Sequence, residues 1–207
     1  MAIRVPRLSY EDLRGIADRF LAERHPAGTI PIPIEELVEF GLGINIVPLP
    51  GLHADHGIDG FLSADMTEIS VDLYVFESRP ARYRFTLAHE AAHLVLHGDA
   101  LKEVAPATIP DWKRFVRELP EGDREWLEYQ AYAFAGLVLA PREPLLREYR
   151  VALRRADEAG INLDQFPDVA KQYIATSVAK VFEVSAAVIE KRLVKDGVWS
   201  SGPGTGR

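Results

Sequence analysis

The pattern His-Glu-Ala-Ala-His, at residues 89–93, lies in a stretch that is predicted to form one helix, residues 82–97. On a helix, His89 and His93 lie on the same face, one turn apart, so both imidazoles can bind one zinc ion. Glu90 is rotated by about 100° from His89 and lies beside the metal rather than on it. From there it can accept a proton from a water molecule that the metal binds. The pattern predicts a helix that supplies two zinc ligands and a general base.

The composition limits the class of protein. A length of 207 residues suits one domain with a small appendage, and 47% apolar with 27% charged residues is typical of a globular chain. The net charge of −7 argues against a protein that mainly coats nucleic acid or an anionic membrane. No cysteine is present, so a metal site must use His, Asp or Glu. Without a signal peptide or an apolar run of roughly 18 residues, we expect a cytoplasmic protein.

The order of predicted elements indicates an α+β fold. Helices are expected from Ser9, with Asp12 completing a weak capping box, and again at residues 33–40. Short strands are expected at residues 44–47, 58–62 and 69–75. Residues 99–118 are expected to be irregular, a candidate flap. The remaining expected elements are helices at residues 121–139, 144–159, 167–182 and 186–196. A small mixed or antiparallel sheet in the first half is thus followed by a mainly helical half.

Two histidines do not complete a catalytic zinc site, which commonly takes three protein ligands and leaves one position for water. His97 follows His93 on the same face, but it lies about 12 Å along the axis from His89. These two cannot reach one ion unless the helix breaks, and residues 94–96, Leu-Val-Leu, contain no Gly. We therefore interpret His97 as a helix cap, a hydrogen-bond partner of the ligands or a core residue.

Carboxylates on the helix expected at residues 121–139 are better candidates for the third ligand. This helix offers four acids: Glu121, Asp123, Glu125 and Glu128. Glu128 leads directly into an apolar face, so its side chain can point inward toward the helix of the two histidines. The other three lie nearer the helix start, where acids commonly stabilise the helix dipole. Periodicity favours Glu128 but leaves the others open.

Longer segments around both motifs form a family pattern. Residues 84–97 read Arg-Phe-Thr-Leu-Ala-His-Glu-Ala-Ala-His-Leu-Val-Leu-His, and from Glu128 the chain reads Glu-x-x-Ala-x-x-Phe-Ala. Both resemble signature helices of the ImmA/IrrE family of zinc metallopeptidases. Four further segments are similar to that family: residues 32–37, 57–60, 179–185 and 192–193. The resemblance covers roughly residues 30–198.

The resemblance implies a zincin-like fold with one zinc ion, and Glu128 as its third ligand. Family members commonly cleave helix-turn-helix transcriptional repressors, which switches on phage, mobile-element or stress-response genes. The implied partner is thus a protein substrate, a separate repressor, and the implied activity is that of a zinc metallo-endopeptidase. We expect four segments: an N-terminal helix (residues 1–29), the metallopeptidase core (30–160), a helix-turn-helix-like closing segment (161–199) and a disordered tail (200–207).

The chain departs from the family pattern at two places. Ala91-Ala92 stands where the family commonly has Leu-Gly, and Tyr132 stands where it usually has Asn. Tyr132 lies four residues after Glu128, on the same helical face. Its phenol can hydrogen-bond a developing oxyanion, or its ring can pack on the core with the hydroxyl at the rim. Packing is the favoured interpretation.

A different class of function has some support in the closing helices. Residues 182–185 join two predicted helices, as the turn of a helix-turn-helix does. Residues 164–195, however, hold five basic and four acidic side chains, so this segment offers little net positive charge for binding phosphates. Direct DNA binding is therefore not expected. The alternative to a peptidase is a zinc-binding regulatory or antitoxin-like protein that acts by binding a partner or DNA, without proteolysis. His53 and His56 are expected in a solvated loop, and Arg82 and Arg84 in a solvated or salt-bridging role at the start of the motif helix.

Overall fold

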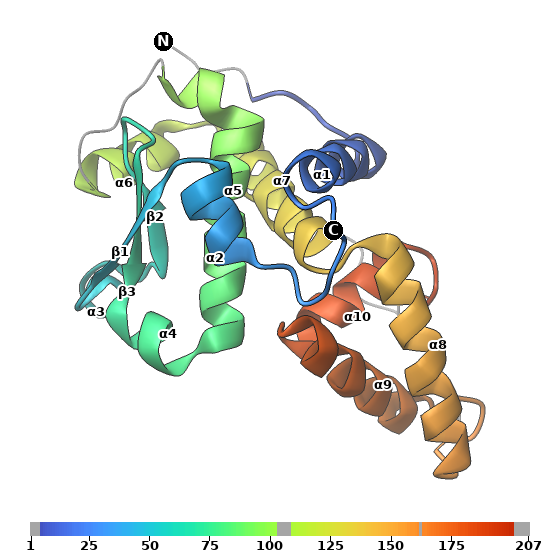
Figure 1. Cartoon of the computed structure of the whole chain (residues 1–207). Coiled ribbons are helices and arrows are strands. Elements are labelled where there is room, and N and C mark those ends of the chain that lie inside the picture. The colour runs from blue at the N-terminus through green and yellow to red at the C-terminus, as the bar shows by residue number, and fades with distance from the viewer. Residues whose placement is uncertain (1–4, 103–108, 162, 201–207) are drawn as a thin grey trace.

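The computed structural model describes residues 5–102, 109–161 and 163–200. Two long helices form its centre, α5 (Pro80–Lys102) and α7 (Glu121–Leu139), which pack against each other (Figure 1). Their contact faces are rich in small side chains: Ala88, Ala91 and Ala92 in α5 and Ala131 and Ala135 in α7 are all almost fully buried. Small side chains let the two helix axes approach closely. This close approach brings residues of the two sequence motifs together.

A small mixed sheet lies beside α5. Its strands are β1 (Asn45–Leu49), β2 (Gly60–Leu62) and β3 (Glu68–Asp72), in the order β1-β3-β2. β1 pairs with β3 in parallel, with Ile46 opposite Ile69, and β2 pairs with β3 antiparallel, with Leu62 opposite Ile69. β2 is an edge strand, and it contacts α5. The predicted α+β class, with a small mixed sheet and a helical second half, is confirmed.

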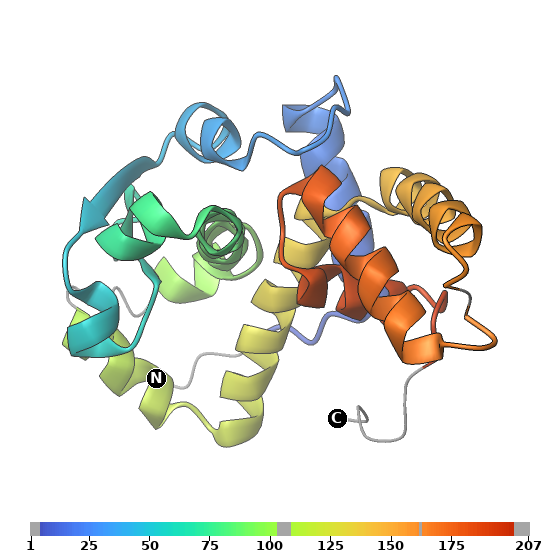
Figure 2. The same ribbon diagram turned by 90° about the horizontal axis from the view of Figure 1, so that it is seen from below.

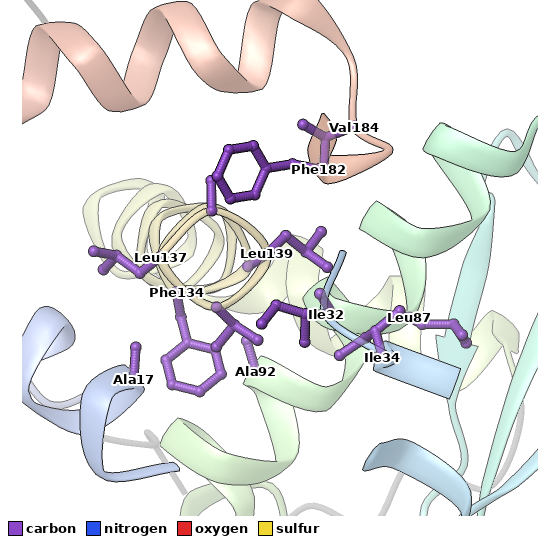
Figure 3. Packing of buried hydrophobic residues seen from close by; sticks show 14 of the residues in the cluster. Ala17, Ile32, Ile34, Leu87, Ala92, Phe134, Leu137, Leu139, Phe182 and Val184 are labelled. Atoms are coloured by element: carbon purple, nitrogen blue, oxygen red, sulfur yellow. The ribbon is translucent and has the colours of Figure 1, made fainter. Parts of the chain in front are cut away.

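Helices on the far side of α7 complete the core. Helix α1 (Tyr10–Arg24) packs on α7 and begins with the predicted capping box, in which Ser9 and Asp12 exchange hydrogen bonds. The closing helices are α8 (Arg142–Glu158), α9 (Pro167–Phe182) and α10 (Ala186–Lys195); in Figure 2 they lie across α7 from the sheet. Figure 3 shows Phe134 reaching from α7 toward α1 while Phe182 approaches α7 from the other side.

Shorter helices connect these elements, and several of them correct the sequence expectations. They are α2 (Ile34–Glu36), the π-helix η1 (Leu37–Gly41), α3 (Leu52–His56), α4 (Leu73–Ser78) and α6 (Ile109–Glu118). The expected strand at residues 69–75 ends early because the Asp72 carboxylate accepts a hydrogen bond from the Val75 amide, 3.2 Å away, and caps α4.

The expectation that residues 99–118 are irregular is wrong for the described part of that segment. Helix α5 continues past Gly98 to Lys102, because a glycine inside a helix costs only about 1 kcal/mol relative to alanine. Pro110 is the second residue of α6, a position where proline is tolerated. Beyond Ser200, the expected tail lies outside the described residues. The division of the chain into four segments stays a prediction. None of the described helices is long and apolar enough to cross a membrane.

Candidate metal centre

Three side chains from α5 and α7 converge at the contact between the two helices. The Nε2 atoms of His89 and His93 are 3.2 Å apart, as expected for imidazoles one turn apart on a helix. Glu128 approaches from α7, with one carboxylate oxygen 3.4 Å from His89 Nε2 and the other 3.8 Å from His93 Nε2. All three ligand atoms lie within 4.8 Å of one another. Of the four acids left open by the sequence, Glu128 is the one that joins the histidines.

The spacing of these atoms fits one small cation. Ligands at about 2.1 Å from a tetrahedral zinc ion are separated by roughly 3.4 Å. The separations of 3.2, 3.4 and 3.8 Å are close to that value. His93 is buried, and His89 and Glu128 are partly buried, so the group is sheltered but reachable. In the described part of the chain, this group of His and Glu side chains could hold a metal ion.

Glu90 lies beside this group rather than in it. Its carboxylate accepts a hydrogen bond of 3.2 Å from the Leu62 amide of β2, so the edge strand fixes its position. Burial is the main cause that raises the pKa of Glu90 to about 7, and the charge of Glu128 adds to it, against the opposing effect of His89. A carboxyl group with a pKa near 7 can both accept and donate a proton near neutral pH.

The sequence alone did not single out Gly60, which borders Glu90. A Cβ at this position would lie 2.5 Å from Thr86 Cγ2 and 3.1 Å from Glu90 Cγ. β2 can therefore pack this closely on α5 only with glycine here. The signal available in the sequence was a glycine at the start of a short strand, which by itself does not identify the helix that the strand contacts.

Replacing Gly60 with Ala is expected to displace β2 or Glu90 and to lower the free energy of unfolding by about 1–3 kcal/mol, as overpacking does. Denaturant unfolding measures this loss. Adding Thr86→Ser removes the methyl group that clashes at 2.5 Å, so we expect the double variant to regain part of the stability. If Thr86→Ser gives no recovery in the Gly60→Ala protein, the steric explanation is wrong.

Two further predicted site residues border the histidines. His97 is buried, and its Nδ1 lies 3.3 Å from Nδ1 of His93, within hydrogen-bond distance. Burial lowers the pKa of His97 to about 4, so the ring is neutral at physiological pH. Tyr132 is 54% exposed, and its ring lies 4.6 Å from that of His89 and stacks on Phe85. Tyr132 thus covers one side of His89, with half of its surface open.

The two histidines and two arginines that were expected outside the site lie outside it, but the loop expected for His53 and His56 is wrong because the chain forms a short helix there. His53 and His56 belong to the short helix α3, and His53 Nδ1 lies 2.9 Å from the Asp59 carboxylate. Arg82 also binds the Asp59 carboxylate: its Nη2 donates a hydrogen bond of 2.7 Å to Oδ1, and its Nε binds the other oxygen. Arg84 donates a hydrogen bond to the Ile32 carbonyl and faces Glu183. Both arginines form ion pairs, which is one of the two roles expected for them.

Arg192, which a DNA-binding surface on the closing helices would use, faces the core instead. It is only 3% exposed, and it pairs with Asp196 and donates a hydrogen bond to the Ala140 carbonyl. A guanidinium held in this way is not available to a phosphate. The structure thus removes one of the basic side chains that favoured nucleic-acid binding by the closing helices.

Comparison with known families agrees with this site. Residues 42–194 match the Peptidase_M78 family, described as the IrrE N-terminal-like domain. The match covers most of the chain and includes both helices of the candidate centre. The chain therefore belongs to this metallopeptidase family, and the ImmA/IrrE resemblance inferred from the motifs is confirmed.

Other comparisons are less informative. No curated protein matches the chain in sequence. Among solved structures, a chain described as a Mycobacterium tuberculosis transcriptional regulator aligns with a TM-score of 0.48 and 20% identity. The alignment covers 88% of this chain and 46% of that chain, so the present chain spans less than half of that protein's length.

Proposed function

We propose that this family member is a zinc-dependent metallo-endopeptidase. Its proposed substrate is a helix-turn-helix transcriptional repressor, whose cleavage regulates gene expression in a stress or mobile-element response. The observation that carries the proposal is the convergence of His89, His93 and Glu128 at separations that suit one metal ion, with Glu90 held beside them. The substrate class rests on the family resemblance, and the cytoplasmic location stays a prediction.

In the proposed mechanism, His89, His93 and Glu128 hold the metal and Glu90 moves the proton. When bound, zinc supplies Lewis acidity, which makes water more acidic and stabilises negative charge on a carbonyl oxygen. Glu90 accepts the proton of the attacking water and later donates it to the leaving amine. The Leu62 amide keeps the carboxylate in place for both steps. His97 orients His93 through the contact between their Nδ1 atoms.

We further propose that the substrate main chain binds along β2. This strand is at the edge of the sheet, and its Leu62 amide points to Glu90 rather than to β3. The edge of β2 that does not pair with β3 therefore faces the candidate centre. An extended peptide can add to such an edge through main-chain hydrogen bonds, which places a peptide bond next to Glu90 independently of the side-chain sequence.

The test is incubation of the purified protein with the helix-turn-helix repressor encoded beside its gene. We expect zinc-dependent cleavage into two fragments, detected by mass spectrometry, and its loss when a chelator is added. Readdition of zinc should restore it. Cleavage that persists in chelator, or intact repressor with every divalent metal tested, would refute the proposed activity toward this substrate class.

A further inference from the structure

A long groove leaves the candidate metal centre on the side away from the sheet. Its walls are the corner between α4 and α5 on one side and α10 on the other, and α7 forms its floor; Figure 2 shows α7 between α5 and the closing helices. Its volume of about 1480 Å³ exceeds the 300–1,000 Å³ that is usual for small-molecule sites. The groove is thus large enough for a segment of polypeptide.

The groove is continuous with the metal centre through two aromatic side chains. Tyr132 and Phe85 line it, their rings stack at 5.7 Å, and the Tyr132 ring lies 4.6 Å from that of His89. Tyr74, from α4 on the same wall as Phe85, is 57% exposed. Exposed aromatic rings of this kind bind apolar side chains of a partner and are enriched where proteins recognise other chains.

The charge of the groove is opposite to that of the whole protein. Arg79, Lys191 and Lys195 line it, and none of them forms an ion pair with a described residue; Glu190 is the one carboxylate among its lining residues. Two further cations, Arg82 and Arg192, are neutralised by Asp59 and Asp196. Arg79 donates hydrogen bonds to the Tyr74 hydroxyl, and Lys195 lies over the Tyr10 and Tyr129 rings, but these neutral partners leave the charges in place. Three cations without a carboxylate partner in a chain of net charge −7 create a local positive potential.

We propose that this groove binds an acidic, amphipathic segment of the polypeptide substrate, adjacent to the bond that is cut. Carboxylates of the segment would face Arg79, Lys191 and Lys195, and its apolar side chains would pack on Tyr74 and Tyr132. The inference rests on the proposed function, since it assigns the groove to the same substrate. It adds a preference for acidic residues at a distance from the scissile bond.

A polypeptide fits this groove better than a nucleic acid does. The cations are few, whereas a nucleic-acid site tracks a backbone with a charge every few ångströms. Arg192 is buried and unavailable to phosphates. The groove also leads directly to the side chains that would cut a peptide bond, through Tyr132 and His89.

The experiment measures binding without turnover. The Glu90→Gln protein, kept in chelator, is titrated against a short fluorescent peptide made of Glu, Leu and Tyr, and against the same peptide with Lys in place of Glu. We expect the acidic peptide to bind and the basic one not to, with affinity that falls as salt is raised. The double variant Lys191→Glu with Lys195→Glu should bind the acidic peptide roughly tenfold more weakly. Lys191→Glu alone should give an intermediate loss.

The matched control is Arg150→Glu with Arg154→Glu, which makes the same charge change on exposed residues of α8 outside the groove. It should leave binding unchanged, and circular dichroism checks that all variants fold. Four outcomes would each overturn the proposal. The two peptides could bind equally, or the control could lose as much binding as the groove variants. A DNA duplex could bind more tightly than the peptide, or the protein could self-associate in a way that the groove variants abolish. Because the assay needs neither metal nor cleavage, it can succeed even if the repressor is never cut. Conversely, cleavage of the repressor together with no preference for acidic peptides would refute the role proposed for the groove but not the peptidase activity.

Discussion

Replacement of Glu90 by Gln is expected to slow peptide cleavage by about 10³-fold while zinc stays bound. The amide keeps the size of the side chain but cannot accept the proton of the attacking water, and general base catalysis typically contributes 10²–10⁴-fold. Glu90 does not belong to the group of three that would hold the metal, so its replacement removes no ligand. Cleavage rates with the repressor and zinc content by elemental analysis measure the two effects.

Glu125→Gln is the matched control, because it makes the same chemical change at an exposed position on α7, one turn before Glu128. It should leave the rate within about twofold, as expected for a surface substitution away from the site. If the Glu90→Gln protein still cuts at the rate of the native chain, Glu90 is not the base. If it instead keeps full regulatory effect in the cell without cutting, the partner-binding alternative is favoured over the peptidase.

Replacement of Asp196 by Ala is expected to lower the free energy of unfolding by about 3–5 kcal/mol, the cost of removing one partner from a buried ion pair. The Asp196 side chain is fully buried and accepts hydrogen bonds from Arg192 at 3.0 and 3.1 Å and from Arg14 at 3.1 Å. Arg192 also binds the Tyr10 hydroxyl and the Ala140 carbonyl, so this cluster joins α1, α10 and the end of α7. Without the carboxylate, Arg192 remains buried without an anion, and Arg14 keeps only its pair with the exposed Glu11.

Urea unfolding followed by circular dichroism measures this loss. Asp18→Ala, at an exposed position on α1, is the control and should change stability by less than about 0.5 kcal/mol. If Asp196→Ala lowers the free energy of unfolding by less than about 1 kcal/mol, the cluster is hydrated and weak, and the expectation is wrong. A large loss would also explain why the closing helices cannot present Arg192 to another molecule.

Long, regular elements of this fold could be predicted from the sequence. The bounds expected for α7 and α9 match the structure, because prolines flank α7 and apolar residues recur at helical spacing in both. Short elements could not be predicted as well. The strand that ends at Asp72 does so because of a single cap, and the helix at residues 52–56 is too short to show a periodic pattern. Local interactions of one residue decide such ends.

The candidate site shows the same division. The spacing of His89 and His93 follows from one helix, and the sequence alone is enough to predict it. The contribution of Glu128 depends on how α5 and α7 cross, which periodicity does not determine. Periodicity therefore left four acids as candidates for the third ligand, and the family resemblance was needed to choose among them. The roles of Gly60 and the Leu62 amide depend on the approach of β2 to α5, a contact between segments far apart in sequence.

Zinc binding measured by calorimetry tests the central claim most directly. The Glu90→Gln protein should bind a single zinc ion per chain, and Glu128→Ala in the same background should weaken that binding by more than about 100-fold, because a ligand matters at least as much as the groups that orient it. The exposed Glu125→Ala should have no effect. If the protein binds no zinc, or if Glu128→Ala binds it as tightly as its parent, the metal centre assigned to His89, His93 and Glu128 is wrong.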